Sequence, residues 1–486
     1  MQIHLLSVNI LTTNRERKEG MFQTIIGTIS SFMYSKLLVI LLIGAGVYFT
    51  IRTRFPQVRL FKNACGSVME KPEDKGAISS FQALMVSTAS RVGTGNIVGV
   101  SSAICIGGFG SVFWMWVIAI IGSASALIES TLAQIYKKKG EDGSCYGGPA
   151  YYIEAALHCR PLAIVFCVAM ILTYAFGFNM LASYNLQSTF SVFSFYEAKM
   201  SPWIIGGILA VLTGWCLLGG GSRIVKVTSM VVPVMGIAYI GISLLVVIIN
   251  IQNVPAMFVR IFEEAFDFKA IFGAFSGSAM MQGIRRGLYS NEAGIGSAPN
   301  ASASANVSHP VKQGLIQALS VFTDTIVICS CTAFIILLSD LPLDGTLKGI
   351  QLTQAAVGHE IGPFGAQFIA FCILLFAFSS IVGNYSYCET NLFFISRHPA
   401  GLQIYRIAVG GMVFFGSVAG LDIVWNLADL FMALMTLINL IALIFLGHLA
   451  LKALKNYNDQ KRRGIKSPVF KASDIPEIED QLSEWK

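Results

Sequence analysis

Charged side chains are scarce in this chain of 486 residues. Asp, Glu, Lys and Arg make up 13% of it, about half the share found in an average soluble domain, whereas 54% of the residues are hydrophobic. The mean hydropathy is +0.66, and no stretch is polar enough to form a separate soluble domain. This composition excludes a soluble globular protein and indicates a chain that crosses a membrane many times.

The usual sequence patterns of metal sites and enzymes are also missing. The 10 cysteines form no CxxC pair and no Cys/His set with zinc spacing, so we interpret them as small hydrophobic residues without a disulfide framework. Gly93-Thr94-Gly95 lacks the third glycine of a dinucleotide-binding loop, and His359-Glu360 lacks the second histidine of a zinc protease. The 6 histidines are scattered along the chain. We therefore expect no enzymatic activity.

Apolar runs of about 20 residues, long enough to cross the hydrocarbon core of a bilayer, recur along the chain. The sequence predicts spans at residues 31–50, 81–106, 112–136, 162–190, 202–220, 227–249, 270–289, 313–338, 364–390, 403–420 and 425–451. The first would be a peripheral extra helix, and the others are helices 1 to 10. The chain then divides into an N-terminal arm with this helix and a loop (1–75), two five-helix repeats (76–250 and 251–452) and a tail (453–486).

The net charge of +7 comes from basic residues in short loops and in the tail, which indicates membrane topology rather than a nucleic-acid partner. Lys and Arg are concentrated in the alternate segments 51–75, 137–160, 221–226, 285–312, 391–406 and 452–486. Because cytoplasmic loops carry the excess of basic residues, we expect the N-terminus outside and the C-terminus in the cytoplasm. The expected location is the plasma (inner) membrane.

Two polar stretches that contain glycine interrupt spans at equivalent places in the two halves of the chain. The first is Ser87–Gly99 in helix 1, and the second is Gly273–Met280 in helix 6. The two halves have opposite predicted orientations, as in an inverted repeat, and paired interruptions of this kind indicate a transporter site near the middle of the bilayer. The alternative is that these glycines only allow helices to pack closely.

A helix that breaks inside the membrane exposes N–H groups at the start of one half and carbonyl groups at the end of the other. In helix 1, residues 94–96 would begin the outer half and suit a carboxylate. The carbonyls of Ala89 and Val92 would end the inner half and suit a sodium ion. The hydroxyls of Ser379 and Ser380 in helix 8 offer further oxygen ligands, although serine often bonds a carbonyl of its own helix instead. The sequence thus predicts a site for a zwitterion and sodium.

Three longer motifs carry a family resemblance. They are Ser90–Ile97 (SRVGTGNI), Gly107–Gly122 (GGFGSVFWMWVIAIIG) and Arg286–Pro299 (RGLYSNEAGIGSAP). Together they resemble the motifs of the alanine or glycine:cation symporter family, the sodium:alanine symporters, over about residues 75–450. The resemblance implies an all-α leucine-transporter-like fold of five plus five inverted helices with one extra N-terminal helix, in which helices 1 and 6 are broken at mid-membrane. It also implies sodium-coupled import of a small neutral amino acid such as alanine (L or D) or glycine.

The resemblance also implies the residues of the site. The substrate-binding residues are expected to be Thr94, Gly95, Asn96, Gln187, Phe275, Ser276, Gly277 and Met280. Asn384, where this chain departs from the family, is added to them because its polar side chain could enlarge the pocket or supply a hydrogen bond. The sodium site is expected to consist of Ala89, Val92, Ser379 and Ser380. No cofactor is expected beyond sodium as the coupling ion, and the expected partners are the amino acid, sodium and the lipid bilayer.

Some alternatives stay open at this point. Many family members carry a tryptophan where this chain has Asn384, which leaves the choice among glycine, alanine and a larger amino acid such as glutamine undecided. Proton coupling would need a titrating carboxylate at the site, and a channel would need symmetric pore-lining segments. Arg91, deep in helix 1, is either a gate or carboxylate partner or a structural cation that pairs with Glu129 or Asp324.

Overall fold

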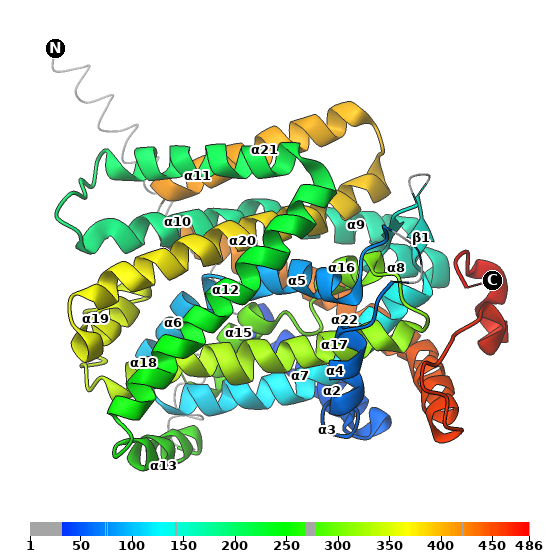
Figure 1. The fold of residues 1–486 in the computed structure, drawn as a ribbon, viewed down its shortest axis with the longest axis horizontal. Helices are drawn as coiled ribbons and strands as arrows, with labels where there is room; N and C mark the ends of the chain where they lie inside the picture. The colour runs from blue at the N-terminus through cyan, green and yellow to red at the C-terminus, as the bar shows by residue number, and fades with distance from the viewer. Residues whose placement is uncertain are drawn as a thin grey trace.

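The computed structural model describes residues 32–72, 74, 76–140, 143–267, 278–419 and 421–485. In these residues, 8 helices are long and apolar enough to cross a membrane. They are α7 (Gly110–Ile135), the run α9–η3–α10–η4 (Arg160–Val192), α11 (Ser201–Leu218), α12 (Gly220–Ile249), the run α17–η6–α18 (Pro310–Leu338), α20 (Phe364–Ile395), α21 (Pro399–Val418) and α22 (Leu421–Arg462). Figure 1 shows α10, α11 and α21 on one side of the molecule and α7 and α17 on the other.

Two of these runs contain π-helical turns. The first consists of α9 (Arg160–Ile171), η3 (Leu172–Phe178), α10 (Asn179–Thr189) and the 3₁₀ turn η4 (Phe190–Val192). The second consists of α17 (Pro310–Phe322), η6 (Thr323–Cys329) and α18 (Ser330–Leu338). Such turns often occur at functional sites in helices, and η3 and η6 both contain residues that surround the candidate site described below.

The shorter elements complete the chain. In the first half they are η1 (Met33–Leu38), α2 (Val39–Thr53), α3 (Pro56–Arg59), α4 (Phe61–Val68), α5 (Ser80–Arg91), η2 (Gly95–Gly99), α6 (Val100–Gly107), the strands β1 (Lys138–Lys139) and β2 (Cys145–Tyr146), and α8 (Pro149–Leu157). In the second half they are α13 (Val254–Ala265), α15 (Ala279–Asn291), α16 (Ala298–Ser304), α19 (Ile350–Ile361), η7 (Ala472–Asp474) and η8 (Pro476–Gln481). The two strands form an antiparallel hairpin in which Lys138 lies opposite Tyr146.

Burial separates inner helices from helices that face lipid. In the run Pro310–Leu338, 72% of the most apolar window is buried inside the protein, and in α7 the share is 67%. In α11, α12 and α21 it is 28%, because large apolar side chains such as Val211, Ile237 and Ile407 point outward. Apolar composition alone therefore does not tell a helix inside the bundle from a helix that faces lipid. The burial places α7 and α17 inside the bundle.

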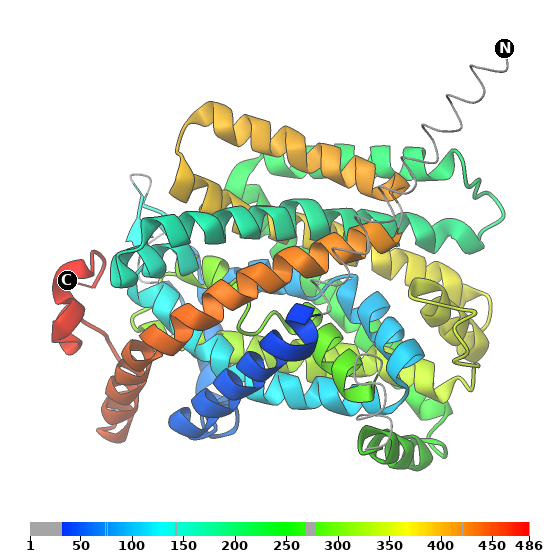
Figure 2. The same ribbon diagram turned by 180° about the vertical axis from the view of Figure 1, so that it is seen from behind.

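The predicted spans agree with the observed helices in the described residues, with two differences at their ends, and residues 270–277 of the predicted span 270–289 lie outside the described part of the chain. The predicted loop 221–226 is helical, because α11 and α12 are joined by a tight turn at Gly220 (φ +67°). The guanidinium of Arg223 reaches back across this turn and donates to the carbonyl oxygen of Trp215 at 2.6 Å. Helix α22 continues to Arg462, beyond the predicted end at residue 451, because Ala453, Leu454 and Tyr457 are buried although the residues between them are polar. Figure 2 shows α22 running across the back of the molecule.

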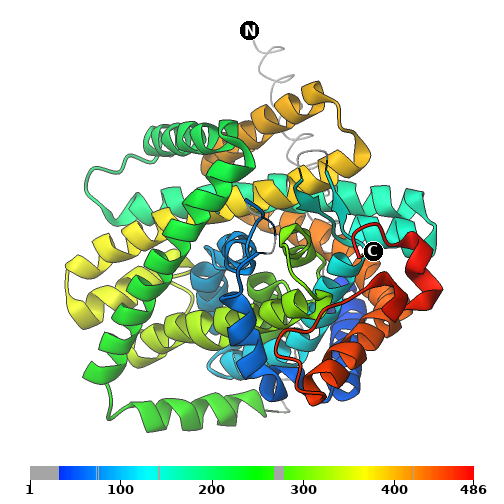
Figure 3. The ribbon, with the colours of Figure 1, turned by 45° about the vertical axis from the view of Figure 1, so that its right-hand side comes forward.

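The tail after α22 folds back onto the rest of the protein. The indole N–H of Trp485 donates to the carbonyl of Gln134 at the end of α7 at 3.0 Å, and the N–H of Phe470 donates to the carbonyl of Ser308 before α17 at 2.9 Å. The tail therefore joins the ends of α7, α17 and α22. Figure 3 shows it beside the last turns of α22, at the same end of the molecule as the hairpin.

Candidate substrate and ion site

Helix 1 breaks near its middle, as the sequence predicts. Its inner half, α5, starts with a capping box in which Ser79 and Gln82 each bond the other's backbone N–H. It ends at Arg91, and Val92 has a non-helical backbone (φ −79°, ψ 88°). The outer half then starts with the π-helical turn η2 and continues as α6. Residues 268–277, which contain the predicted interruption of helix 6 up to Gly277, lie outside the described residues, and the described part of that helix, α15, starts after Ser278.

Glycines let two other helices, α15 and α20, approach this break closely. A Cβ atom on Gly93 would lie 2.0 Å from Oγ of Ser380 in α20, and one on Gly95 would lie 2.4 Å from the ring of Tyr289 in α15. A Cβ on Gly383 would lie 2.5 Å from the backbone nitrogen of Ser90. The first two contacts are made by side chains, whereas at Gly383 the backbones of helices 1 and 8 meet at a distance that only glycine allows.

A small cavity lies beside the break. It is lined by Ser90, Arg91, Gly93, Thr94, Gly95, Phe178, Ala182, Tyr289, Glu292, Ser380 and Asn384. These residues come from helices 1, 3, 6 and 8. The centre of a water-sized sphere can move through about 20 Å³ of it, which is roughly the room that one or two water molecules need. The cavity is thus narrow in this state, and its wall combines backbone, hydroxyl, amide and charged groups.

A chain of hydrogen bonds ties the wall of the cavity together. The Ser90 hydroxyl lies 2.6 Å from Oδ1 of Asn384 and 3.3 Å from Oε1 of Glu292. Asn384 donates through Nδ2 to Oδ1 of Asn179 at 2.9 Å, and the Ser297 hydroxyl donates to Oε2 of Glu292 at 2.8 Å. Helices 1, 3, 6 and 8 are therefore connected through polar side chains at the level of the cavity.

Two groups on the cavity wall have no hydrogen-bond partner among the described residues. One is the hydroxyl of Ser380, and the other is the guanidinium of Arg91, whose three nitrogens are all buried. Arg91 is 2% exposed. Leaving a buried polar group unpaired costs about 1–3 kcal/mol, and more if it is charged. The Arg91 guanidinium is therefore suited to bind an oxygen-rich anionic ligand, and the oxygen of the Ser380 hydroxyl is suited to bind a cation.

Two further buried acids stand near the break but do not line the cavity. Asp324, in η6, accepts from Nδ2 of Asn96 at 2.6 Å and from the Ser290 hydroxyl at 2.7 Å. Glu129, in α7, accepts from the N–H of Gly294 at 3.3 Å and from Nδ2 of Asn439 at 2.9 Å. Neither forms an ion pair with Arg91 among the described residues. The structure therefore shows no direct ion pair of Arg91 with either acid, although the charge of Arg91 acts on both carboxylates.

Aromatic rings cover the cavity between helices 3, 6 and 10. The rings of Phe178 and Tyr289 are 4.8 Å apart, edge to face, and Tyr289 lies 5.1 Å from Trp425 in α22. The guanidinium of Arg286 lies 4.2 Å from the centre of the Trp425 ring and 3.9 Å from Oδ1 of Asp429. These contacts join helices 3, 6 and 10 beside the cavity, and Phe178 and Tyr289 belong to the hydrophobic core.

The structure brings part of the predicted set together. Thr94, Gly95 and Asn384 line the cavity, as does Ser380 from the predicted sodium set. Ala89 and Val92 are buried at the end of the inner half of helix 1. In that position their carbonyl groups belong to the last turn, which has no intrahelical partners.

Other predicted residues lie away from the cavity. Asn96 is buried against Asp324, and its own Oδ1 accepts from the N–H of Gly93 at 2.9 Å. Gln187 accepts from the Tyr196 hydroxyl at 2.8 Å, and the hydroxyl of Ser379 donates to the carbonyl of Phe376 in its own helix at 3.1 Å. Met280 is half-buried in α15 and is not part of the cavity wall. Phe275, Ser276 and Gly277 lie outside the described residues.

Sequence reasoning missed several residues of the cavity wall. Phe178, Ala182, Tyr289 and Glu292 line it and were assigned no role, and Ser90 lies within the predicted interruption Ser87–Gly99 but was not named as a site residue. Tyr289 and Glu292 lie inside the motif RGLYSNEAGIGSAP, so the motif carried a signal that was read only as family likeness. Phe178 and Ala182 lie one helical turn apart in a predicted span, and as apolar residues they could not be told from the other apolar residues of that span.

The fold and the site define a class of protein. In the residues that the structure describes, the 8 long apolar helices and the broken helix 1 pack around a polar cavity, which is the architecture of leucine-transporter-like membrane transporters. The solved structure of MhsT in complex with L-phenylalanine has this fold, with a TM-score of 0.58, 15% identity, and 85% of this chain and 93% of that chain covered.

The sequence places the chain in one family of that class. The family model described as "Sodium:alanine symporter family" matches residues 19–472, so the chain belongs to this family. It is 48% identical to the amino-acid carrier protein AlsT of Bacillus subtilis, with 95% of this chain and 97% of the relative covered. It is 46% identical to the probable sodium/glutamine symporter GlnT of the same organism, with 93% and 94% covered.

Proposed function

We propose that this protein is a symporter that imports a small neutral amino acid, alanine (L or D) or glycine, together with sodium by alternating access. The observation that carries the proposal is the break of helix 1 at a small, mostly buried cavity, with the unpaired Ser380 hydroxyl opposite it. Membership in the sodium:alanine symporter family supports both the ion and the substrate class.

In this proposal the substrate carboxylate binds at the start of the outer half of helix 1. The first N–H groups of a helix have no intrahelical partners and attract negative charge, and Thr94 and Gly95 stand at this place. The unpaired guanidinium of Arg91 adds a positive charge to the same cavity. The carboxylate of Glu292 lies on the wall as well and favours the ammonium group or the cation.

Sodium would bind at the end of the inner half. The carbonyl oxygens of Ala89 and Val92 and the hydroxyl of Ser380 supply the oxygen ligands that hard cations prefer. Glu292 compensates the charge of the ion in a region of low dielectric constant. A cation and a zwitterion in one small cavity each reduce the cost of burying the other, which couples their transport.

The aromatic cover suggests how access alternates. Phe178, Tyr289 and Trp425 belong to three different helices, so their separation would open one approach to the cavity. In the proposed cycle, the bundle of helices 1, 2, 6 and 7 moves against the remaining helices around the bound ligands. The protein would lie in the plasma (inner) membrane, with its N-terminus outside and its C-terminus in the cytoplasm.

Two alternatives have specific support. A glutamine substrate is favoured by the likeness to the probable sodium/glutamine symporter, although the narrow cavity favours a smaller side chain. Proton coupling is favoured by Glu292, a buried carboxylate on the cavity wall. Both alternatives concern the same site and differ in the ligand.

Uptake into liposomes tests these assignments. Purified protein would be given labelled glycine, L-alanine, D-alanine or glutamine under a sodium gradient, a proton gradient or neither. We expect concentrative uptake of alanine or glycine that needs the sodium gradient. Uptake that follows the proton gradient and ignores sodium would contradict the coupling, and faster uptake of glutamine than of alanine would contradict the substrate.

A further inference from the structure

A second cavity lies at the C-terminal ends of α2 and α22, and it shares no lining residue with the transport site. Its volume is about 330 Å³, and it is lined by Arg52, Thr53, Arg54, Arg59, Leu451, Leu454, Lys455, Asn458, Asp459 and Arg462. Five of these residues are basic, and one is acidic. We propose that this cavity binds the anionic headgroup of a phospholipid.

The positive charge of the cavity is largely uncompensated. Arg462 and Asp459 are 3.9 Å apart, but their side chains are 70% and 41% exposed, so this pair is weak. Arg54 and Lys455 form no ion pair with any residue that the structure describes, and Arg59 donates to the carbonyl of Thr53 at 3.2 Å. The cavity therefore has a strong preference for an anion with several acceptor oxygens, such as a phosphodiester.

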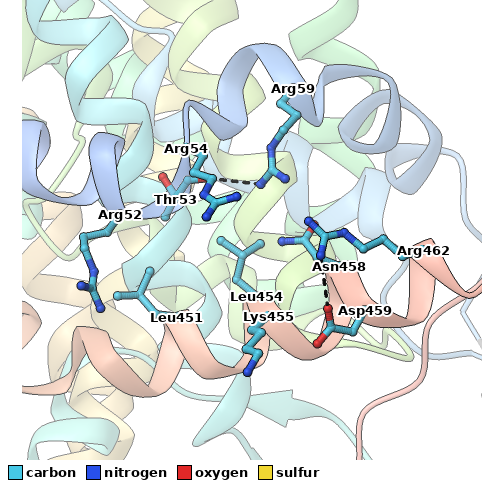
Figure 4. A pocket seen from close by; sticks show the side chains of 10 residues that line it. All are labelled: Arg52, Thr53, Arg54, Arg59, Leu451, Leu454, Lys455, Asn458, Asp459 and Arg462. Carbon is cyan, nitrogen blue, oxygen red and sulfur yellow. Dashed lines mark hydrogen bonds and ion pairs between the residues drawn. The ribbon is translucent and has the colours of Figure 1, made fainter.

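The side chains converge from separate elements. Figure 4 shows the guanidinium groups of Arg54, Arg59 and Arg462 near the centre of the view, whereas Arg52 and Lys455 lie nearer its edge. Arg54 follows α2 with a left-handed backbone (φ 58°) that turns the chain at this point. The preference for basic residues on the cytoplasmic side explains how many occur here. It does not explain why residues about 400 positions apart should line one cavity.

The apolar surface next to the cavity matches the rest of a lipid. α2 and α22 pack against each other, and both helices carry large exposed apolar side chains before they reach the cavity at their C-terminal ends. On α2, Ile40 and Ile51 are 70% and 62% exposed, and on α22, Ile444 and Phe445 are 53% and 63% exposed. In a membrane protein such side chains face acyl chains. A ligand with an anionic head and apolar chains therefore fits this surface. A free phosphate would contact only the basic residues of the cavity.

The position of the cavity agrees with this occupant. The segment 51–75 and the end of α22 belong to the side that the distribution of Lys and Arg assigns to the cytoplasm. Anionic lipids give that leaflet a negative surface potential, and basic pockets between helices there bind lipid headgroups. The bound lipid would join the extra helix α2 to α22, the last helix of the bundle.

The proposal can be tested on the purified full-length chain with defined probes. The bound phospholipid would be counted by native mass spectrometry after incubation with phosphatidylglycerol or phosphatidylcholine, and the midpoint of thermal unfolding would be measured with each lipid. We expect one tightly held phosphatidylglycerol and a rise in the midpoint that phosphatidylcholine does not give. Inorganic phosphate at the same concentration should give no comparable rise, and an equal rise would overturn the lipid assignment.

Charge-neutralising variants separate the cavity from general surface charge. The triple variant Arg54→Gln, Arg59→Gln, Arg462→Gln should bind phosphatidylglycerol about 100-fold more weakly, since each basic residue near an anionic lipid contributes roughly a fivefold factor. The matched control is Lys71→Gln, Lys138→Gln, Arg463→Gln, which removes the same charge from exposed residues outside the cavity. Equal weakening in both variants would overturn the proposal.

Single variants keep the test decisive if the triple variant does not fold. Arg54→Gln alone should weaken binding by about fivefold, and Lys138→Gln alone should leave it unchanged. If Arg54→Gln binds as tightly as the unaltered protein, the cavity is not the lipid site.

Discussion

Ser379 and Ser380 are neighbours in α20 whose hydroxyl groups have different surroundings. Ser380 faces the cavity without a partner, whereas Ser379 bonds its own helix and lies 3.4 Å from the sulfur of Met235. If Ser380 binds sodium, Ser380→Ala should raise the sodium concentration for half-maximal uptake by about tenfold, because one bond to a charged group is lost. Ser379→Ala is the matched control and should change it by less than about twofold. Equal effects would contradict the ion site, and Gln187→Ala should affect sodium dependence less than Ser380→Ala.

Gly93 offers a test of the close approach between helices 1 and 8. In Gly93→Ala the new methyl group would lie 2.0 Å from Oγ and 3.2 Å from Cβ of Ser380, so the hydroxyl must turn away from the cavity or the helices must separate, at a cost of about 1–3 kcal/mol. We expect uptake to fall by about tenfold or more and the midpoint of thermal unfolding to fall. Gly214→Ala, in α11, is the control, because nothing lies within 4 Å of its added methyl group and alanine favours a helix. A Gly93→Ala protein with normal uptake would contradict a role for the Ser380 hydroxyl and its contact with Gly93 in transport.

Single residues also show where sequence reasoning succeeds and where it stops. Gly93, Thr94 and Gly95 were found because two glycines one residue apart weaken a helix wherever they occur. Ser379 and Ser380 were indistinguishable, because successive positions on a helix differ by about 100° and only the neighbouring helices decide which of them faces the cavity. Asn96 was assigned to the substrate, but its amide binds Asp324 from a helix more than 200 residues later in the chain.

At the scale of elements, the start of α17 is held by the tail. His309, just outside the membrane-spanning segment, is fully buried, and its ring lies 5.2 Å from that of Tyr457 and 5.4 Å from that of Phe470. Its Nε2 lies 3.2 Å from Oδ1 of Asn456. Burial lowers the pKa of His309 to about 3, so this histidine is neutral in the folded protein at neutral pH.

This burial predicts a loss of stability in mild acid. The pKa of His309 is lower in the folded protein than the value of about 6.5 in the unfolded chain, so the unfolded chain takes up the proton first as the pH falls. The contribution of the buried, neutral His309 to the free energy of unfolding is complete above pH 6.5 and should decrease by about 2 kcal/mol at pH 5. Thermal unfolding at pH 7.5 and pH 5 should show a smaller decrease in His309→Gln, whereas His448→Gln, at an exposed histidine, should behave like the unaltered protein. The same decrease in all three proteins would contradict this origin.

The apolar runs in the sequence predict where helices cross the membrane but not where those helices end. The apolar runs placed the spans, because burial in lipid needs about 20 apolar residues in a row. They could not place the end of α22, where the helix leaves the membrane and its last turns pack one face against the protein. They also could not show that the tail returns to α7, since Phe470 and Trp485 lie in a polar segment with no helical period.

At the scale of the whole molecule, the proposed orientation can be tested with cysteine labelling. Among the described cysteines only Cys65, in α4, is exposed, and it lies in the segment assigned to the cytoplasm. A membrane-impermeant maleimide should label it in inside-out vesicles and not in intact cells, and Cys65→Ser should remove this labelling. Lys199→Cys in that background, on an exposed residue of an outer loop, should be labelled in intact cells. The reverse pattern would invert the topology.

The sequence by itself determined the class of membrane protein, the order of the helices, the break in helix 1 and the family. These features depend on the composition of local segments and on the free energy of placing each segment in lipid, so they can be read along the chain. Only the tertiary structure decided which side chains meet at the break. The pairing of Gly93 with Ser380, the unpaired state of Arg91 and the convergence of Arg54 with Arg462 depend on the rotation and approach of packed helices, which no local pattern specifies.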